Sequence, residues 1–408
     1  MVLLQDFMAI LKFQDISFSR LKGFLRVHFL KIYYFDISDK ELDSLGKWTQ
    51  GRKSIEFKDL GQEKAEKRFN RLLEKGFKEL KNVISGKKTV YIHRFSGIPL
   101  IGSNSFGIVD RGSNIIEIKP ITGCNLGCIY CSVDDSKRIT EFVLEEEYIT
   151  QEFRKLAEFK SCDGLEAHIG TQGEPFFYSK MPDLVRNLSK IRNVNKITID
   201  TNGVLLTPKL IDTLVKAGMT RFNLSINALD HKLAKRIAGD ENYDIARIMM
   251  LARHIAKRCD IIIAPVWIPG INDSEIEPII QFALSLKTKN KVLIGIQNFL
   301  NYKNGRNPVK AQTWEQFYDK LSYFEKKYDV KLIGDIGYDV KPAKQLSKPF
   351  RKGDSVKAEI VCSGRLKNEM IAVSGERTIS IPDCNKQKGI VKVRILRSKH
   401  NIFSGKII

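Results

Sequence analysis

The chain has 408 residues, 43% of them hydrophobic, a size and composition that fit a soluble globular protein of two or three domains. Sixty-eight Lys and Arg residues against 47 Asp and Glu residues give a net charge of +21. This imbalance favours a polyanionic partner such as nucleic acid, and a thermophile surface rich in ion pairs would not require it. No apolar run reaches the roughly 20 residues of a membrane span, so we expect no membrane partner.

Residues 1–110 form a predicted α+β region in which we find no functional motif. Phe24–Phe35 is rich in aromatic and β-branched residues and is predicted to be a strand. Residues 59–84 repeat apolar side chains every three or four positions, which predicts one long amphipathic helix. Residues 96–113 contain several Gly and Ser residues and are predicted to be a loop or hairpin. The role of this region stays open.

Residues 111–340 alternate predicted strands with predicted helices. The strand candidates are 115–119, 164–169, 196–200, 221–226, 260–266 and 292–297, and the helices between them are 144–158, 179–192, 207–217, 230–237, 243–258 and 273–286. This alternation predicts an α/β domain with a parallel sheet. Six units suggest an open, partial (β/α)6 barrel, in which the chemistry belongs at the C-terminal ends of the strands.

Three of the seven cysteines lie within eight residues after the first of these strands. Cys124, Cys128 and Cys131 have the spacing C-x3-C-x2-C. Thiolates bind iron–sulfur clusters, and a 4Fe–4S cluster with three protein ligands keeps one iron open for a small chelating molecule. The alternative is three unrelated buried thiols, since free cysteine packs as a small hydrophobe. Cys162, Cys259, Cys362 and Cys384 show no ligand spacing, and their role stays open.

The cysteine motif resembles the signature of the radical S-adenosylmethionine (SAM) superfamily, and the chain is similar to archaeal-type iron–sulfur oxidoreductases of that group. The resemblance covers roughly residues 110–340 and implies the partial barrel, a 4Fe–4S cluster and SAM on its open iron. It also implies a one-electron reductant of the ferredoxin or flavodoxin type and cleavage of SAM to a 5′-deoxyadenosyl radical. Tyr130 matches the aromatic position near the adenine. The resemblance identifies no catalytic side chain.

The later strand ends carry further marks of this resemblance. The segment from His168 to Pro175 is similar to the family's glycine-rich motif for the SAM amino group, although Thr171 and Gln172 replace glycines. Asn202-Gly203 and the stretch before Asp273 could equally be a turn and a helix cap. The cofactor-binding residues that the resemblance implies are Gly170, Gln172, Gly173, Glu174, Thr201, Asn202, Ser225, Asn227, Pro269 and Gly270.

The sixth strand end is polar, aromatic and basic, and lies where a substrate should enter. We therefore predict substrate-binding roles for Gln297, Asn298, Tyr302, Lys303 and Arg306. The alternative is a solvated loop.

Residues 341–352 are basic, contain two prolines and are predicted to be a linker. Short strand runs at 355–361, 369–374, 377–381 and 390–397 predict a small β-barrel in residues 353–408. Its end resembles the TRAM domain of tRNA-modifying enzymes, an OB-like module. From Pro349 to Ile408 there are 13 Lys and Arg against 5 Asp and Glu, which favours phosphate contacts. Arg394, Arg397 and Lys399 are the candidate contacts there.

These features together predict a radical enzyme that modifies tRNA or another structured RNA, by methylation or another change at carbon. The N-terminal 120 residues contain no cysteine for the second cluster of a methylthiotransferase. The alternative is modification of a peptide or protein, or synthesis of a small-molecule cofactor. An exposed iron–sulfur cluster requires a reducing compartment, so we expect the cytoplasm, and we expect a monomer. We also expect removal of 349–408 to spare SAM cleavage.

Overall fold

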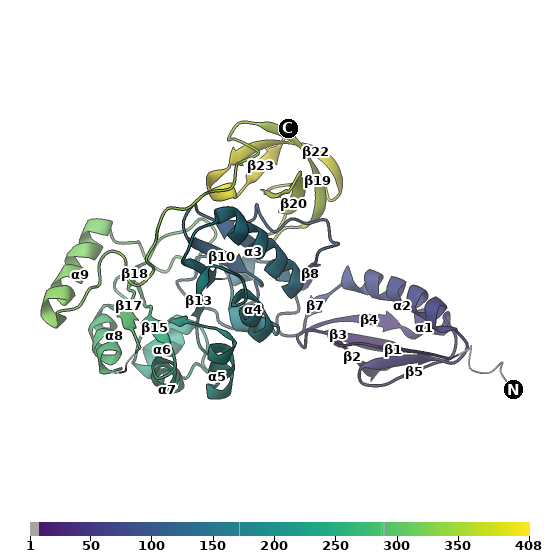
Figure 1. The fold of residues 1–408 in the computed structure, drawn as a ribbon, viewed down its shortest axis with the longest axis horizontal. Helices are drawn as coiled ribbons and strands as arrows, with labels where there is room; N and C mark the ends of the chain where they lie inside the picture. The colour runs from purple at the N-terminus through teal and green to yellow at the C-terminus, as the bar shows by residue number, and fades with distance from the viewer. Residues whose placement is uncertain (1–7, 171, 287, 289) are drawn as a thin grey trace. The chain divides into compact units, whose positions relative to one another are not determined.

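The computed structural model describes residues 8–170, 172–286, 288 and 290–408. Thr171, one of the two positions that depart from the glycine-rich motif, lies outside them. The chain forms two compact units (Figure 1). One contains residues 8–92 with 139–143, and the other contains residues 93–138 with 144–408. In the described part of the chain, no helix is long and apolar enough to cross a membrane.

The N-terminal unit is α+β, as predicted, and contains two antiparallel sheets. The larger sheet has the order β11(Thr140–Leu144), β8(Lys88–Ile92), β7(Lys81–Asn82), β4(Tyr33–Ser38), β3(Phe24–Phe29), β2(Ile16–Leu21). The smaller has the order β1(Ala9–Lys12), β6(Ser54–Phe57), β5(Trp48–Gln50). The two helices of this unit in the described residues are α1(Asp39–Asp43) and α2(Gln62–Phe77).

Two predictions for this unit are wrong in detail. The predicted single strand Phe24–Phe35 is a hairpin, because Leu30 and Lys31 turn the chain with φ of 47° and 72°. Neither residue type favours a positive φ, so the sequence carries no turn signal there. The predicted helix over 59–84 is shorter, since α2 ends at Phe77 and β7 follows.

The second unit is built on a seven-stranded sheet. Its order is β17(Val292–Ile294), β15(Asp260–Ile263), β14(Arg221–Leu224), β13(Val194–Thr201), β12(Leu165–Ile169), β10(Ile115–Lys119), β9(Gly107–Asp110). All neighbours from β10 to β17 pair in parallel, and β9 closes one edge as the antiparallel partner of β10. The sequential order confirms the predicted α/β sheet, and all six predicted strands are present.

Helices connect the strands in the order that the sequence predicts. They are α3(Glu146–Lys160), α4(Met181–Leu188), α5(Pro208–Ala217), α6(His231–Ala238), α7(Ile245–Ala256) and α8(Asp273–Ser285). The predicted last two strands are each interrupted, so that β16(Val266–Trp267) and β18(Gln297–Asn298) form a separate parallel pair. The helix α9(Trp314–Tyr328) is an addition that the strand–helix alternation did not identify.

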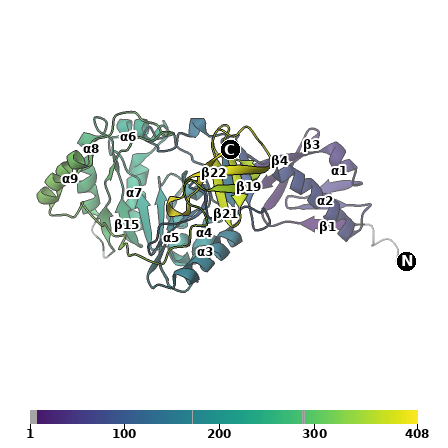
Figure 2. The same ribbon diagram turned by 90° about the horizontal axis from the view of Figure 1, so that it is seen from above.

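The C-terminal barrel is closed, with the order β19(Ser355–Ser363), β20(Met370–Ser374), β21(Arg377–Ile381), β23(Ser404–Ile407), β22(Gly389–Arg397). This confirms the predicted small β-barrel, to which β23 adds a strand. Its interior is apolar and fully buried at Ala372, Ile379, Val393 and Ile395. The barrel, yellow in Figures 1 and 2, lies near α3 and β10 and far from α8 and α9.

The segment 341–352 is fixed to the second unit rather than extended into solvent. The Asp110 carboxylate accepts a hydrogen bond from the backbone N–H of Leu346 and pairs at 2.8 Å with the Lys160 ammonium. The Lys160 ammonium also donates to the carbonyl of Lys344. Both side chains of the ion pair are completely buried. This buried pair therefore attaches the segment between the sheet and the barrel.

Candidate cluster and cofactor site

The cysteine loop begins directly after β10 and is packed against the end of α6. The backbone N–H of Ile129 donates to the carbonyl of Ile237 at 3.0 Å. A Cβ on Gly239 would lie 2.2 Å from the carbonyl oxygen of Gly127, and Gly239 has a φ of +63°. Only glycine combines this positive φ with so close an approach of the two backbones. Gly239 therefore ends α6 in direct contact with the cysteine loop.

Arg306 holds the other side of the cysteine loop. Its backbone N–H donates to the carbonyl of Cys131 at 2.8 Å, and its guanidinium donates to the carbonyl of Gly127. Its Nε donates to the Asp134 carboxylate at 3.0 Å. The side chain predicted to bind substrate therefore positions the cluster loop, and its substrate role stays a prediction.

The three cysteines line one cavity of about 220 Å³. Several predicted cofactor residues line it as well, from the ends of neighbouring parallel strands: Tyr130, Gln172, Gly173, Glu174, Thr201, Asn202 and Ser225. Arg306, predicted to bind substrate, lines it too, so the structure brings together residues up to 182 positions apart in sequence. It also adds lining residues that the sequence did not identify: Leu126, Arg138 and Asp200.

The thiols fit an iron–sulfur cluster better than a single metal ion. Burial raises the pKa of the Cys124 and Cys128 thiols to about 12, so a thiolate there needs a nearby cation. Iron supplies that charge, because metals bind cysteine as the thiolate. Within the residues that the structure describes, no three metal-binding side chains converge on one point. A cubane does not require this, because each thiolate binds a different iron.

Glu174 is the buried acid of this cavity. Its carboxylate accepts hydrogen bonds from the Thr201 hydroxyl at 2.7 Å and from the backbone N–H of Asn202 at 2.9 Å. Burial raises the pKa of Glu174 to about 7, although these hydrogen bonds oppose the shift. A carboxyl that titrates near neutrality and faces the cysteine cavity is suited to binding the amino group of SAM.

Gly173 fixes this acid beside the cysteines. A Cβ there would lie 2.3 Å from the carbonyl oxygen of Gly123, the residue before Cys124. The backbone N–H of Glu174 donates to the same carbonyl at 2.8 Å. The glycine-rich loop and the cysteine loop are therefore in direct backbone contact.

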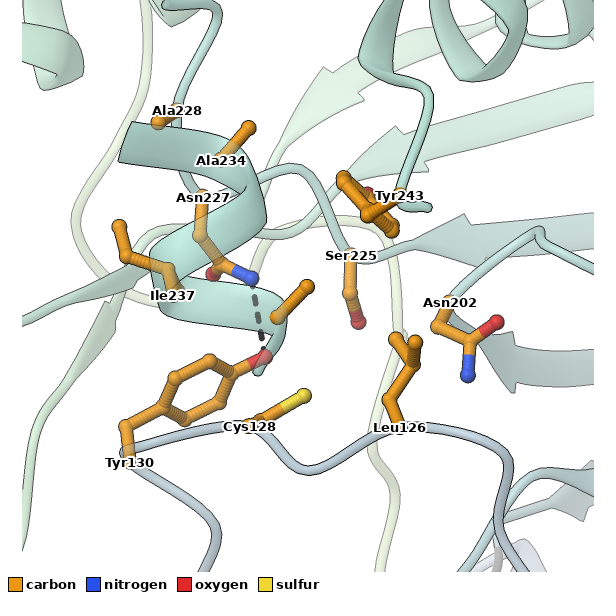
Figure 3. A pocket seen from close by; sticks show the side chains of 11 residues that line it. Leu126, Cys128, Tyr130, Asn202, Ser225, Asn227, Ala228, Ala234, Ile237 and Tyr243 are labelled. Carbon is orange, nitrogen blue, oxygen red and sulfur yellow. Dashed lines mark hydrogen bonds between the residues drawn. The ribbon is translucent and has the colours of Figure 1, made fainter. Parts of the chain in front are cut away.

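Tyr130, Ser225 and Asn227 surround a second, narrower pocket that shares Cys128 with the first (Figure 3). The Asn227 amide donates to the Tyr130 hydroxyl at 2.9 Å, and its oxygen accepts from the backbone N–H of Val266. Leu126, Ser225 and Asn202 border the same space in Figure 3. This pocket has a volume of only about 20 Å³, too small for an adenosine group in this structure, so the cofactor roles of Tyr130, Ser225 and Asn227 stay predictions.

The other predicted residues lie away from the two cavities. Gly170 follows β12, and Pro269 and Gly270 form the turn before α8. The Asn298 amide donates weakly to the carbonyl of Gln312, whereas the side chains of Gln297, Tyr302 and Lys303 are exposed. Arg394, Arg397 and Lys399 are exposed on the barrel. None of these residues lines either cavity, and their roles stay predictions.

A polar network on β12 and β13 borders the cavity and was not identified from the sequence. The Thr198 hydroxyl donates to Glu166 at 2.7 Å, so the His168 Nδ1, 2.9 Å away, is the donor to Thr198. The His168 Nε2 lies 3.2 Å from the Asp200 carboxylate. Burial lowers the pKa of His168, but Asp200 outweighs this and raises it overall. Alternate residues of a strand share a face, which is the signal that could have revealed the network.

Comparison with known proteins agrees with this site. Residues 118–283 match the family model described as the radical SAM superfamily. An uncharacterized protein of Methanocaldococcus jannaschii is 38% identical over 360 residues, 81% of this chain and 83% of that protein. A probable GTP 3′,8-cyclase of Archaeoglobus fulgidus is 26% identical over 50% of this chain and 64% of its own length.

A solved structure is also similar. The crystal structure of Streptococcus suis SuiB bound to the precursor peptide SuiA has a TM-score of 0.45 and 15% identity, over 79% of this chain and 71% of that one. The family uses a 4Fe–4S cluster and SAM, and the three cysteines at the cavity are suited to hold the cluster. Residues 118–283 of this chain are therefore a radical SAM superfamily domain.

Proposed function

We propose that this radical SAM enzyme modifies a nucleotide of tRNA or another structured RNA, by methylation or another change at carbon. One observation carries the RNA assignment, which is a row of cations across three strands of the barrel. In it, Lys357 of β19 pairs directly with Lys392 of β22, and Arg394 of β22 pairs with Lys406 of β23.

This cationic row is unfavourable unless an anion covers it. All four side chains are exposed, and among the described residues none of them forms an ion pair. Like charges opposite each other destabilise a sheet, typically by a few tenths of a kcal/mol or more per pair. A phosphate backbone would offset this repulsion and release counterions, as in other small barrels that bind nucleic acid.

The position of the cysteines in the cavity fits an RNA substrate for radical chemistry. When bound, the cluster and SAM supply a radical that removes hydrogen from an unreactive carbon. The cysteines lie in a recessed cavity, so a target base must reach it unpaired or flipped out of its stack. We further propose that the parallel sheet curves as a partial (β/α)6 barrel and that the C-terminal barrel is TRAM-like. We also propose that the protein is a cytoplasmic monomer and that a ferredoxin or flavodoxin supplies its electron.

The second candidate is a small-molecule reaction, including cofactor synthesis. The similarity to GTP 3′,8-cyclases favours it, since those proteins are named for a reaction on a free nucleotide. The cation row does not favour it, because one nucleotide cannot cover four cations on three strands. Modification of a peptide has no specific support in the described residues.

Mass spectrometry of tRNA nucleosides from a strain lacking the gene, beside its parent, tests the proposal. Loss of one modified nucleoside, restored by the intact gene and not by a Cys128→Ala variant, supports RNA modification and gives the mass of the added group. An unchanged profile in both tRNA and ribosomal RNA would instead support the small-molecule candidate.

A further inference from the structure

We propose that Arg138 and Arg365 form a phosphate-binding site on the wall of the cluster cavity, for a phosphate group of the nucleotide being modified. The inference rests on the proposed function for the identity of the ligand. It adds that the C-terminal barrel supplies part of the substrate site in addition to binding RNA on its outer face.

A turn of the barrel places Arg365 behind Gln172, so that it contacts a residue of the cavity wall without lining the cavity itself. The connection between β19 and β20 is closed by a backbone hydrogen bond from Gly364 to Glu369. The Glu369 carboxylate accepts from the backbone N–H groups of Arg365 and Leu366, at 2.9 and 3.0 Å. The Arg365 guanidinium donates to the side-chain oxygen of Gln172, which lines the cluster cavity.

The barrel is anchored where this turn meets the radical domain. Leu366 forms a β-bridge with Arg138, seven residues after Cys131. Elsewhere, the backbone N–H of Thr378 donates to Ile101 at 3.0 Å, and that of Phe403 donates to Gly102 at 2.8 Å. Several contacts between residues far apart in sequence thus hold Arg365 in place. They argue against a barrel that moves independently of the radical domain.

The two guanidinium groups carry more positive charge than their surroundings balance. Arg138 lines the cavity and its side chain is only 1% exposed. Its guanidinium donates to the carbonyls of Thr122 at 2.7 Å and Val133 at 3.4 Å and, within the described part of the chain, pairs with a single carboxylate, Asp135, at 3.7 Å. Among the described residues, Arg365 has no carboxylate within ion-pair distance. The Nε atoms of both arginines are buried without a hydrogen-bond partner. Burial and the proximity of Arg138 lower the pKa of Arg365 to about 10.

Such a pair requires an anion. Buried charges are normally paired, because removing an ion from water costs several kcal/mol. Guanidinium groups bind phosphate through paired hydrogen bonds, and a donor on each arginine is unused. The cluster thiolates could balance part of the charge, so the test separates the two explanations.

The test compares full-length, cluster-reconstituted protein with its Arg365→Ala and Lys367→Ala variants. Lys367 is an exposed cation of the same turn and serves as the matched control. Thermal unfolding is followed at constant ionic strength against inorganic phosphate, a nucleoside 5′-monophosphate, the matching nucleoside and malonate. We expect the two phosphates to stabilise the parent and Lys367→Ala, and Arg365→Ala to bind them about tenfold more weakly or worse.

Three outcomes would overturn the site. They are an unchanged phosphate response in Arg365→Ala, stabilisation by malonate alone, and loss of cluster absorbance in Arg365→Ala, which would assign the charge to the cluster. If the alanine variant does not fold, Arg365→Met keeps the length of the side chain and decides in the same assay. The nucleoside profile tests RNA modification independently, so failure of this site and failure of the proposed function are distinguishable.

Discussion

Glu174 couples the chemistry of the cavity to the stability of the cluster-free protein. Its pKa is about 7 in the fold, against the ordinary value of 4.5. The folded state therefore binds this proton more tightly than the unfolded chain does. The resulting contribution to the free energy of unfolding is complete below about pH 4.5, falls as the pH rises, and is lost above about pH 7.

Glu174→Gln should remove this pH dependence, because the glutamine cannot ionise. At pH 8 the variant should be more stable than the parent by on the order of 3 kcal/mol, with little difference at pH 4.5. Denaturant unfolding of the cluster-free proteins at both pH values measures this. Glu158→Gln, at an exposed position of α3, is the control, and a parental pH slope in Glu174→Gln would contradict the assignment.

Replacing Cys124, Cys128 or Cys131 by Ala should abolish the visible absorbance of the reconstituted cluster and the cleavage of SAM. Each thiolate would hold a different iron, so losing one removes one of the cluster's three protein ligands. Cys162→Ala is the matched control, since Cys162 lines neither cavity, and it should keep both signals. Equal loss in the control would indicate a general effect on folding.

At the scale of elements, the site depends on contacts between loops that follow different strands. A Cβ added to Gly173 would lie 2.3 Å from the carbonyl oxygen of Gly123, the residue before Cys124. Gly173→Ala should therefore displace the cysteine loop and lower the cluster content after reconstitution severalfold. Gly295→Ala meets only a movable Ile262 methyl group at 3.0 Å and should reconstitute normally. Iron and sulfide quantification compares the two.

The buried ion pair between Lys160 of α3 and Asp110 of β9 links two elements of the second unit and contributes to its stability. Lys160→Met leaves the Asp110 carboxylate buried without its cation, and should lower the free energy of unfolding by about 3–5 kcal/mol. Lys155→Met removes an exposed pair with Glu152 and should cost at most about 1 kcal/mol. Denaturant unfolding distinguishes them, and equal effects would show that burial does not matter here.

At the scale of the whole molecule, the cation row gives a prediction about salt. The double variant Lys392→Ala with Arg394→Ala should reduce the dependence of log affinity for tRNA on log salt by about 0.7–0.9 per lost contact. The double variant Lys64→Ala with Lys67→Ala removes the same charge from exposed positions of α2 and should leave the slope unchanged. Equal slopes for the two double variants would show that tRNA binds elsewhere.

The sequence by itself predicted most of the elements and three cysteines as cluster ligands. The cysteine spacing is local in sequence, and the strand–helix alternation follows from hydrophobic periodicity, so both can be read without coordinates. The same holds for the barrel strand β22, whose buried positions alternate regularly with exposed ones. It did not determine the hairpin at Leu30 and Lys31, because tertiary contacts there override residue preference.

Only the tertiary structure decided which distant side chains share the cavity. Asp200, which lines the cavity, and His168, which contacts it from the next strand, meet only because of the register between β12 and β13. Arg365 is more than two hundred residues from Cys131, and nothing near it in sequence marks it as a partner of the cavity residue Gln172. The physical reason is that such contacts arise from the register of strands and the docking of the barrel, which are set by packing over the whole unit.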